Sequence, residues 1–256
     1  MDAKKEQLCL RIDRLQILTS GWIHIVLVDV AGGKLPVCEP GQFVEVAVER
    51  APVLLNRPFS VYNSSEDVLE LLVAPVGRAS NALGEYAVGD CLRVIMPLGH
   101  GFSSVEKGKK VLLVGGGVGI APMYYQMLHL KSAGAEPVVV FGSRTAPDRW
   151  ICDRFEAECT LYICTDDGTE GFHGLVTQHP EFKPGSYDLV QICGPKPMMA
   201  ACAAIAKSAG VTTEVSLENH MACGLGACLC CVEDTRHGNV CVCKDGPVFN
   251  INELQW

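Results

Sequence analysis

The first hundred residues alternate short apolar runs with turn signals. Apolar and β-branched residues fill the runs, and glycine, proline, asparagine and aspartate separate them, which is typical of β-strands. We expect strands in LCLRIDRLQIL, WIHIVLVDV, QFVEVAVE, PFSVYN, VLELLVAPV and CLRVIMPLG, and one short helix in SNALGEY. Because a closed sheet leaves no exposed edge, this pattern predicts an antiparallel β-barrel.

The pattern changes at Lys107. An apolar strand in KKVLLV, a glycine turn, a helical stretch and a second apolar strand in EPVVVF form a βαβ unit, which implies a parallel sheet. The stretches TLYICTDDG, GLVTQHP, YDLVQICGPKPMMAACAAIAKSAG and TTEVSLE continue the alternation. It stops near residues 210–217, where a cysteine-rich segment begins.

These changes divide the chain into three expected domains. The fold class is all-β plus α/β: an antiparallel barrel at residues 1–104, a Rossmann-like parallel α/β domain at 105–212, and a small cysteine-rich domain at 213–256. A chain of 256 residues is long enough for two domains and a small module.

Composition and charge exclude several classes of protein. The net charge of −8 argues against nucleic-acid binding, which requires a basic surface. No stretch reaches the roughly 18 apolar residues of a membrane span, and the N-terminus lacks the apolar core of a signal peptide. We therefore expect a cytoplasmic protein without a membrane partner. In that reducing compartment, clustered cysteines ligate metals more often than they form disulfides.

Four glycines separate the first strand of the α/β domain from its helix. In VLLVGGGVGIAP they are Gly115, Gly116, Gly117 and Gly119. Unblocked backbone N–H groups and a helix N-terminus there can face a diphosphate, although a tight turn needed only for close packing would look similar. The spacing is not G-x-G-x-x-G and no acidic residue closes the next strand, so a variant dinucleotide-binding fold is favoured.

The C-terminal segment holds six cysteines: Cys223, Cys228, Cys230, Cys231, Cys241 and Cys243. The C-x4-C-x2-C spacing with a later cysteine is that of plant-type [2Fe–2S] proteins, whose thiolates hold iron. Zinc sites favour two C-x2-C knuckles, and only Cys228 and Cys231 form one. The spacing favours iron over zinc, and it leaves Cys241 and Cys243 equal as the fourth ligand.

Three motifs, in this order, resemble those of the ferredoxin–NADP reductase superfamily of flavoprotein reductases. RPFS resembles the Arg-x-Tyr-Ser element, GGGVGIAP the nicotinamide loop, and CGPKPMM the Cys-Gly-Pro turn. In that superfamily an FAD-binding antiparallel barrel precedes a nucleotide-binding α/β domain. The resemblance therefore implies FAD in the barrel and NAD in the α/β domain, and the cysteine spacing adds a small [2Fe–2S] domain after them.

The resemblance also implies the FAD contacts. The Arg57 guanidinium suits a diphosphate, Phe59 offers a flat face to the isoalloxazine ring, and Ser60 can give a hydrogen bond to the ring edge. GRAS stands where the family has Gly-x-Gly-Thr, with alanine in place of the second glycine. The full implied set is Arg57, Pro58, Phe59, Ser60, Leu72, Val73, Ala74, Ala79 and Ser80.

The implied nicotinamide nucleotide site lies in the α/β domain. Cys193 would pack beside the nicotinamide, and it has no activating His or Asp at a recognisable spacing. The acidic pair in TDDG would repel a 2′-phosphate, which favours NAD, whereas Arg144 leaves NADP open. The implied contacts are Gly115, Gly116, Gly117, Gly119, Thr165, Asp166, Cys193, Gly194 and Pro195.

The C-terminal segment resembles the signature of the electron transfer subunits of class 1B dihydroorotate dehydrogenases. In these subunits one residue separates the last ligand from DGPVF, and that ligand position is Cys243 here. The resemblance therefore implies cluster ligation by Cys223, Cys228, Cys231 and Cys243. It also implies a partner: an FMN-containing (β/α)8 catalytic subunit that oxidises dihydroorotate to orotate in pyrimidine (UMP) biosynthesis. The implied assembly is a heterotetramer of two subunits of each kind.

This set of cofactors predicts an electron converter. Nicotinamide exchanges two electrons at once, an iron–sulfur cluster exchanges one, and a flavin does both. We expect electrons to run from FMN through [2Fe–2S] and FAD to NAD+, and no catalytic side chain beyond the cofactor sites. One alternative is the small subunit of a related NAD(P)H–ferredoxin transhydrogenase or sulfide dehydrogenase, in which a departure from four cysteine ligands is expected. The other is a zinc-stabilised binding module without redox function.

Overall fold

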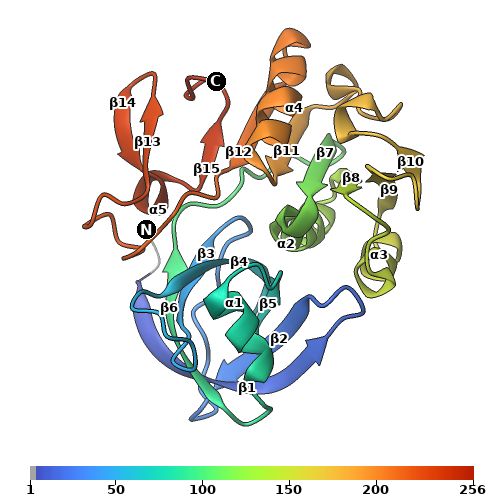
Figure 1. Ribbon diagram of the computed structural model, residues 1–256. Helices are drawn as coiled ribbons and strands as arrows, with labels where there is room; N and C mark the ends of the chain where they lie inside the picture. Colours follow the sequence, from blue (N-terminus) through green and yellow to red (C-terminus); the bar gives the residue numbers. More distant parts are fainter. Residues whose placement is uncertain (1–3) are drawn as a thin grey trace. The chain divides into compact units, whose positions relative to one another are not determined.

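The computed structural model describes residues 4–256 (Figure 1). These residues form two compact units, each described by itself. The barrel unit contains the chain through Gly101, with Asn219–Glu233 and Val240–Pro247. The α/β unit contains Phe102–Glu218, Asp234–Asn239 and Val248–Trp256. Each unit thus combines segments that are far apart in the sequence.

Six antiparallel strands close the barrel, as the alternation predicted. They are β1 (Glu6–Ile17), β2 (Ile23–Asp29), β3 (Phe43–Ala47), β4 (Arg57–Ser64), β5 (Leu69–Val73) and β6 (Cys91–Leu98), in the order β1-β2-β5-β4-β3-β6. The expected helix is α1 (Arg78–Ala82), followed by the 3-10 turn η1 (Leu83–Glu85). Fully buried side chains such as Ile25, Val44 and Leu92 fill the interior.

The cysteine-rich segment packs on the outside of the barrel. All five residues of β3 are buried, whereas a strand with one solvent-facing side would bury only alternate residues. A Cβ at Gly224 would lie 2.9 Å from Glu45 Cγ and 2.9 Å from Leu98 Cδ1. Farther along, the His100 N–H donates to the Gly246 carbonyl at 2.6 Å. The segment therefore covers the outer face of β3 and the end of β6.

The α/β unit is built on a seven-stranded sheet of order β10-β9-β8-β7-β11-β12-β15. Its parallel strands are β7 (Lys110–Gly116), β8 (Glu136–Ser143), β9 (Thr160–Thr165), β10 (Phe172–His173), β11 (Leu189–Cys193) and β12 (Thr212–Ser216). Helix α2 (Ile120–Ser132) packs on β7 and β8, and α4 (Lys196–Ser208) packs on β11 and β12. The predicted parallel sheet is confirmed.

The remaining elements of this unit are short. Asp148 is the N-cap of helix α3 (Arg149–Glu156), and its carboxylate accepts the Trp150 N–H at 3.0 Å. GLVTQHP contributes the 3-10 turn η3 (Val176–Gln178), and η4 (Pro184–Ser186) precedes β11. No helix within residues 4–256 has the length and apolar character needed to cross a membrane.

The last strand of the sheet, β15 (Val248–Asn250), was not expected from the sequence. It pairs antiparallel with β12, with Val215 opposite Phe249. Strand β15 and all but the first residue of β12 fall within residues 213–256, so this stretch is shared between the sheet and the segment on the barrel. The hairpin β13 (Val232–Thr235) and β14 (Gly238–Cys241) and the short helix α5 (Val242–Asp245) complete it.

A buried polar network fixes the start of the α/β unit to its sheet. Glu214 on β12 accepts hydrogen bonds from the Ser103 N–H at 3.1 Å and from the Ser103 hydroxyl. Gln191 on β11 donates to Glu214 at 2.8 Å and to the Ser103 carbonyl at 3.1 Å, and it accepts from Gln126 of α2 at 2.7 Å. The network ties one loop to three elements of the unit.

Replacing Gln191 with leucine is expected to destabilise the protein. The apolar side chain removes three hydrogen bonds and leaves the buried Gln126 amide with only the Ser103 carbonyl, at 3.2 Å, as an acceptor, which costs about 1–3 kcal/mol. The midpoint of urea unfolding measures this loss. Gln7→Leu, at an exposed position of β1, is the control and is expected to change stability by less than about 0.5 kcal/mol. Equal effects of the two variants would contradict the prediction.

Candidate cofactor sites

The RPFS motif occupies the start of β4, on the barrel wall. All four of its residues are half-exposed, whereas Val61 and Tyr62, which follow them, are completely buried. The Arg57 guanidinium donates from one nitrogen to the carbonyls of Leu55 at 2.8 Å and Asn56 at 3.0 Å. These bonds hold Arg57 at the strand start and leave its other N–H groups for a ligand, so the motif offers the accessible surface that a flavin needs.

The second implied FAD element, residues 72–80, can offer a flavin mainly its backbone and few side chains. Leu72, Val73 and Ala79 are buried in the barrel unit, and only Ala74 is half-exposed. The Ser80 hydroxyl accepts the Gly77 N–H at 2.9 Å and donates to the Gly77 carbonyl at 3.1 Å. Its hydrogen-bonding capacity is therefore largely used within the turn that begins α1.

The glycine loop and the CGP turn meet in the α/β unit. The loop runs from the end of β7 through the 3-10 turn η2 (Gly117–Gly119) into α2. A Cβ at Gly119 would lie 2.6 Å from the Gly194 nitrogen, and one at Gly116 would lie 2.8 Å from Met198 Cε. Gly117, at φ +53°, has nothing within 4 Å of its Cβ position. A Cβ at Gly115 would lie 2.7 Å from Ile120 Cδ1, so close packing explains three of the four glycines, and Gly117 is the open position.

Replacing Gly119 with alanine is expected to displace this loop. The new methyl group meets the backbone of the CGP turn, which cannot rotate away, so we expect a cost of roughly 1–3 kcal/mol and a KM for NADH raised at least about tenfold. Steady-state NADH oxidation with an artificial acceptor measures the change. Gly185→Ala is the matched control, because its nearest neighbour would be 3.6 Å away. An unchanged KM in Gly119→Ala would contradict the prediction.

Cys193, the last residue of β11, and Glu218, which follows β12, form a polar pair. The Cys193 thiol lies 3.8 Å from Glu218 Oε1. Desolvation raises the pKa of Cys193 well above its usual value and also raises the pKa of Glu218. The Cys193 thiol is therefore uncharged at neutral pH, as a packing residue should be. Sequence reasoning gave Glu218 no role.

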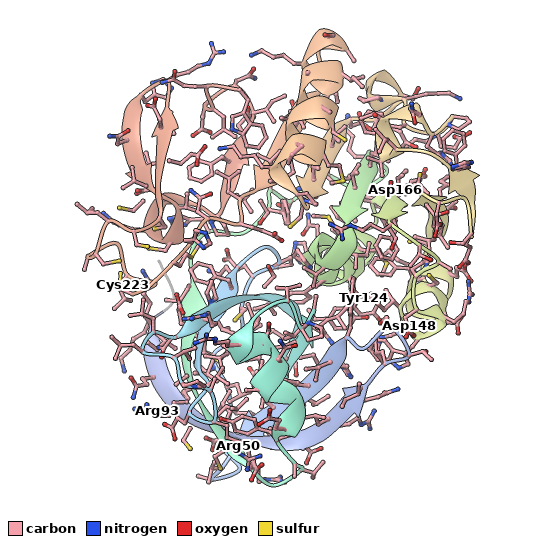
Figure 2. The ribbon with its side chains drawn as sticks, viewed as in Figure 1. Arg50, Arg93, Tyr124, Asp148, Asp166 and Cys223 are labelled. Atoms are coloured by element: carbon pink, nitrogen blue, oxygen red, sulfur yellow. The ribbon has the colours of Figure 1, made fainter. Side chains whose placement is uncertain are left out.

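The two implied residues at the end of β9 differ in what they can offer a nucleotide. Thr165 is completely buried, and its hydroxyl donates to the Glu170 carbonyl at 2.7 Å to close the following turn. Asp166, labelled in Figure 2, is exposed, and its N–H donates to the Ser143 carbonyl of β8 at 3.1 Å. Ligands bind at this edge of parallel sheets, so Asp166 is the better candidate for a ribose contact.

The four implied cluster ligands are gathered in two pairs. The Cys223 and Cys228 thiols are within hydrogen-bonding reach of each other, and so are those of Cys231 and Cys243. Within residues 4–256, no three His, Cys, Asp or Glu side chains gather as the ligands of one metal ion would. Two thiol pairs match the two iron atoms of a [2Fe–2S] cluster. The donor set therefore fits this group.

Backbone N–H groups already point at the sulfur atoms. Leu225 donates to Cys223 Sγ at 3.4 Å, and the Cys243 N–H donates to Cys231 Sγ at 3.3 Å. Desolvation raises the pKa of Cys223, but hydrogen bonds from the backbone of Leu225 and Cys228 and from the Cys228 thiol outweigh it and lower that pKa to about 6. Cys223, labelled in Figure 2, is thus prepared as a thiolate, the form that binds iron.

The geometry distinguishes Cys241 from Cys243. Cys243 is 1% exposed and its sulfur accepts the Gly226 N–H at 3.1 Å. The Cys241 thiol is half-exposed and donates to the Gly226 carbonyl at 3.9 Å. Burial, then the Cys231 thiol, raises the pKa of Cys243 to about 12, so metal binding must displace its proton. These contacts support Cys243 as the fourth ligand, and that assignment stays a prediction.

Leu229, between two implied ligands, has a strained backbone. Its φ of +57° is the only positive φ of a non-glycine residue among the described residues. This conformation costs roughly 1–2 kcal/mol for such a side chain, and strain of this kind concentrates at functional sites. The side chain is 64% exposed, so core packing does not hold it there. The sequence held no signal for this strain.

Glu45 is a buried carboxyl that the sequence analysis did not single out. It is completely buried on β3, and neither carboxylate oxygen has a hydrogen-bond partner in the described part of the chain. Burial, then the charge of Cys223, raises its pKa to about 7, and Arg57 opposes the shift. Glu45 thus interacts electrostatically with both the RPFS motif and the cysteine-rich segment. In QFVEVAVE it looked like an ordinary outward-facing residue of a barrel strand.

Comparisons with known proteins agree on one family. The model of the iron-sulfur cluster binding domain of dihydroorotate dehydrogenase B matches residues 218–255. The dihydroorotate dehydrogenase B (NAD(+)) electron transfer subunit of Caldanaerobacter subterraneus subsp. tengcongensis is 38% identical over 87% of this chain and 88% of its own. The protein of that name from Clostridium acetobutylicum is 36% identical over 84% and 85%.

A solved structure supports the same fold. The NADH-dependent reduced ferredoxin-NADP oxidoreductase superposes with a TM-score of 0.82 and 29% sequence identity. The match covers 96% of this chain and 90% of that chain. The likeness therefore extends over the barrel, the α/β sheet and the cysteine-rich segment.

Proposed function

Because this chain belongs to the family of dihydroorotate dehydrogenase B (NAD(+)) electron transfer subunits, we propose that it passes electrons from a dihydroorotate-oxidising catalytic subunit to NAD+. One observation carries the proposal: the four paired thiols and the RPFS motif belong to the same compact unit. A cluster held by those thiols would lie on the barrel that holds the flavin.

The residues of the chain divide the work of binding. Arg57 binds the FAD diphosphate, while Phe59 and Ser60 orient the isoalloxazine ring. Gly117 leaves room for the NAD diphosphate at the N-terminus of α2, and Asp166 accepts hydrogen bonds from the ribose hydroxyls. The four cysteine thiolates would bind the two iron atoms and offset part of their positive charge. Bound together, FAD, [2Fe–2S] and NAD supply the exchange between two-electron and one-electron steps.

The partner is proposed to be an FMN-containing catalytic subunit in a heterotetramer of two subunits of each kind, in the cytoplasm, serving pyrimidine biosynthesis. The surface of the cysteine-rich segment supports docking there. Leu225 is 48% exposed, Leu229 64% and Val232 38%, which is unusual for apolar side chains in one short segment. A partner that covers them would also bring its flavin near the cluster.

The test is co-expression with the catalytic subunit from the same genome. The purified complex should show flavin absorption with a broad shoulder at longer wavelength, and dihydroorotate should drive NADH formation. Leu229→Glu should reduce recovery of the complex while leaving the spectrum of the isolated subunit intact. A colourless, zinc-containing protein would overturn the redox assignment.

A second function is favoured by the likeness to the ferredoxin-NADP oxidoreductase, at 29% identity over 96% of this chain. In that case the subunit would exchange electrons between NAD(P)H and ferredoxin. The same preparation separates the two functions. NADH formation that depends on reduced ferredoxin and not on dihydroorotate would replace our assignment with this one.

A further inference from the structure

Two cysteines outside the cofactor sites lie next to each other on the outer face of the barrel. Cys9 on β1 stands opposite Arg93 of β6, and Cys91 of β6 stands opposite Arg11 of β1. Residues two apart on a strand share a face, so Cys9 and Cys91 are diagonal neighbours on one face. Both are exposed. Arg93, labelled in Figure 2, is part of this face.

The two thiols interact electrostatically. Desolvation raises the pKa of Cys9, and the next causes are a hydrogen bond with the Cys91 thiol and repulsion from its charge. Glu49 raises this pKa further and Arg93 lowers it, and these two form an ion pair of 3.0 Å beside the thiols. The register of the two strands and the electrostatic interaction thus both make the two thiols near neighbours on this face.

The other cysteines are not equivalent. In the described chain, the only exposed thiols outside the cysteine-rich segment are Cys9 and Cys91. Cys38, Cys152 and Cys202 are buried, and burial raises their pKa values to about 12, so a dissolved disulfide cannot reach them. An adjacent exposed pair, unlike a lone thiol, can complete a two-electron oxidation within one molecule.

We propose that Cys9 and Cys91 form a reversible redox modification site that exchanges with small disulfides such as oxidised glutathione. One thiolate attacks the glutathione disulfide, forms a mixed disulfide and releases one glutathione. The second thiolate then attacks the protein sulfur, forms the Cys9–Cys91 disulfide and releases the second glutathione. Two protein thiols are oxidised, one glutathione disulfide is reduced, and the two thiol protons pass to the released glutathiones.

The disulfide would join the first and last strands of the barrel. Cys9 and Cys91 enclose residues 10–90, so the bond restricts a long loop of the unfolded chain and should raise the thermal midpoint. Diagonal neighbours on antiparallel strands are separated by about 7–8 Å between Cα atoms, beyond the usual range of disulfides. The strands must shift slightly to close the bond, which makes it easy to reduce again.

The test uses the complete protein with its cofactors, incubated without oxygen in oxidised glutathione, alkylated, and digested with trypsin without reduction. The two cysteines fall in separate peptides with one cysteine each, residues 6–11 and residues 79–93. We expect these peptides to be joined, two hydrogen masses below their sum, and to separate after dithiothreitol. The oxidised protein should melt at a higher temperature.

The matched variants are Cys9→Ser and Cys91→Ser. In each, the remaining thiol should carry one glutathione and no cross-link should form, while the flavin and cluster absorption stay unchanged. Glutathione on both Cys9 and Cys91 of the same unlinked wild-type molecule would overturn the proposal. So would an absence of reaction at both thiols while the exposed Cys230 is modified, or a cross-link from either thiol to a different cysteine.

Discussion

Replacing Cys243 with serine is expected to abolish the [2Fe–2S] absorption, while replacing Cys241 with serine leaves it in place. Cys243 is buried, its thiol pairs with that of Cys231, and its sulfur accepts the Gly226 N–H at 3.1 Å. A serine oxygen is a harder and shorter ligand than a thiolate and cannot reach the same iron position. Iron and sulfide content, with the visible spectrum of the anaerobically purified protein, measures the outcome.

Each possible result of this pair has a distinct meaning. If the cluster is intact in Cys243→Ser and lost in Cys241→Ser, Cys241 and not Cys243 is the fourth ligand. Cys230→Ser is the control for changing a thiol within the same segment, because Cys230 lies outside the implied ligand set. FAD content, measured on the same samples, should stay unchanged in all three variants, which separates loss of the cluster from general unfolding.

The sequence predicted those parts of the fold that depend on local pattern. Alternating apolar positions predicted the barrel strands, and continuous apolar runs such as KVLLV predicted the parallel sheet, because each pattern follows from burial of one or both faces. Strand β15 was missed because three residues after Pro247 carry no periodicity. It is a strand only because the edge of β12 is available to pair with it.

Residue identity and spacing predicted the candidate ligands of the site, but not the choice among them. Spacing left Cys241 and Cys243 equal, and the structure separates them by burial and hydrogen bonds that depend on where Gly226 lies. Glu45 was invisible for a different reason. A glutamate in a barrel strand is expected to face water, and only the packing of Gly224 over β3 encloses it. Contacts between distant segments were thus the missing information.

Replacing Glu45 with glutamine is expected to stabilise the protein above pH 7. The pKa of this acid rises from 4.5 to about 7, chiefly through burial, so the folded state prefers the protonated form. Below pH 4.5 the carboxyl is neutral in both states and costs nothing. Between that pH and about 7 the unfolded state loses its proton first, and stability falls as pH rises. The full difference, about 3 kcal/mol, is present above pH 7.

Glutamine has the same shape and no charge, so it removes this dependence. Melting temperatures of wild type and Glu45→Gln should therefore be close at pH 5 and separate progressively up to pH 8, with the variant higher. Glu39→Gln is the matched control, since Glu39 is exposed and should show no such separation. A variant less stable than wild type at pH 8 would mean that the folded protein stabilises the ionised Glu45 carboxylate, through Arg57 or through a bound cofactor. The carboxylate between the RPFS motif and the cysteine-rich segment would then be a binding group and not a buried neutral acid.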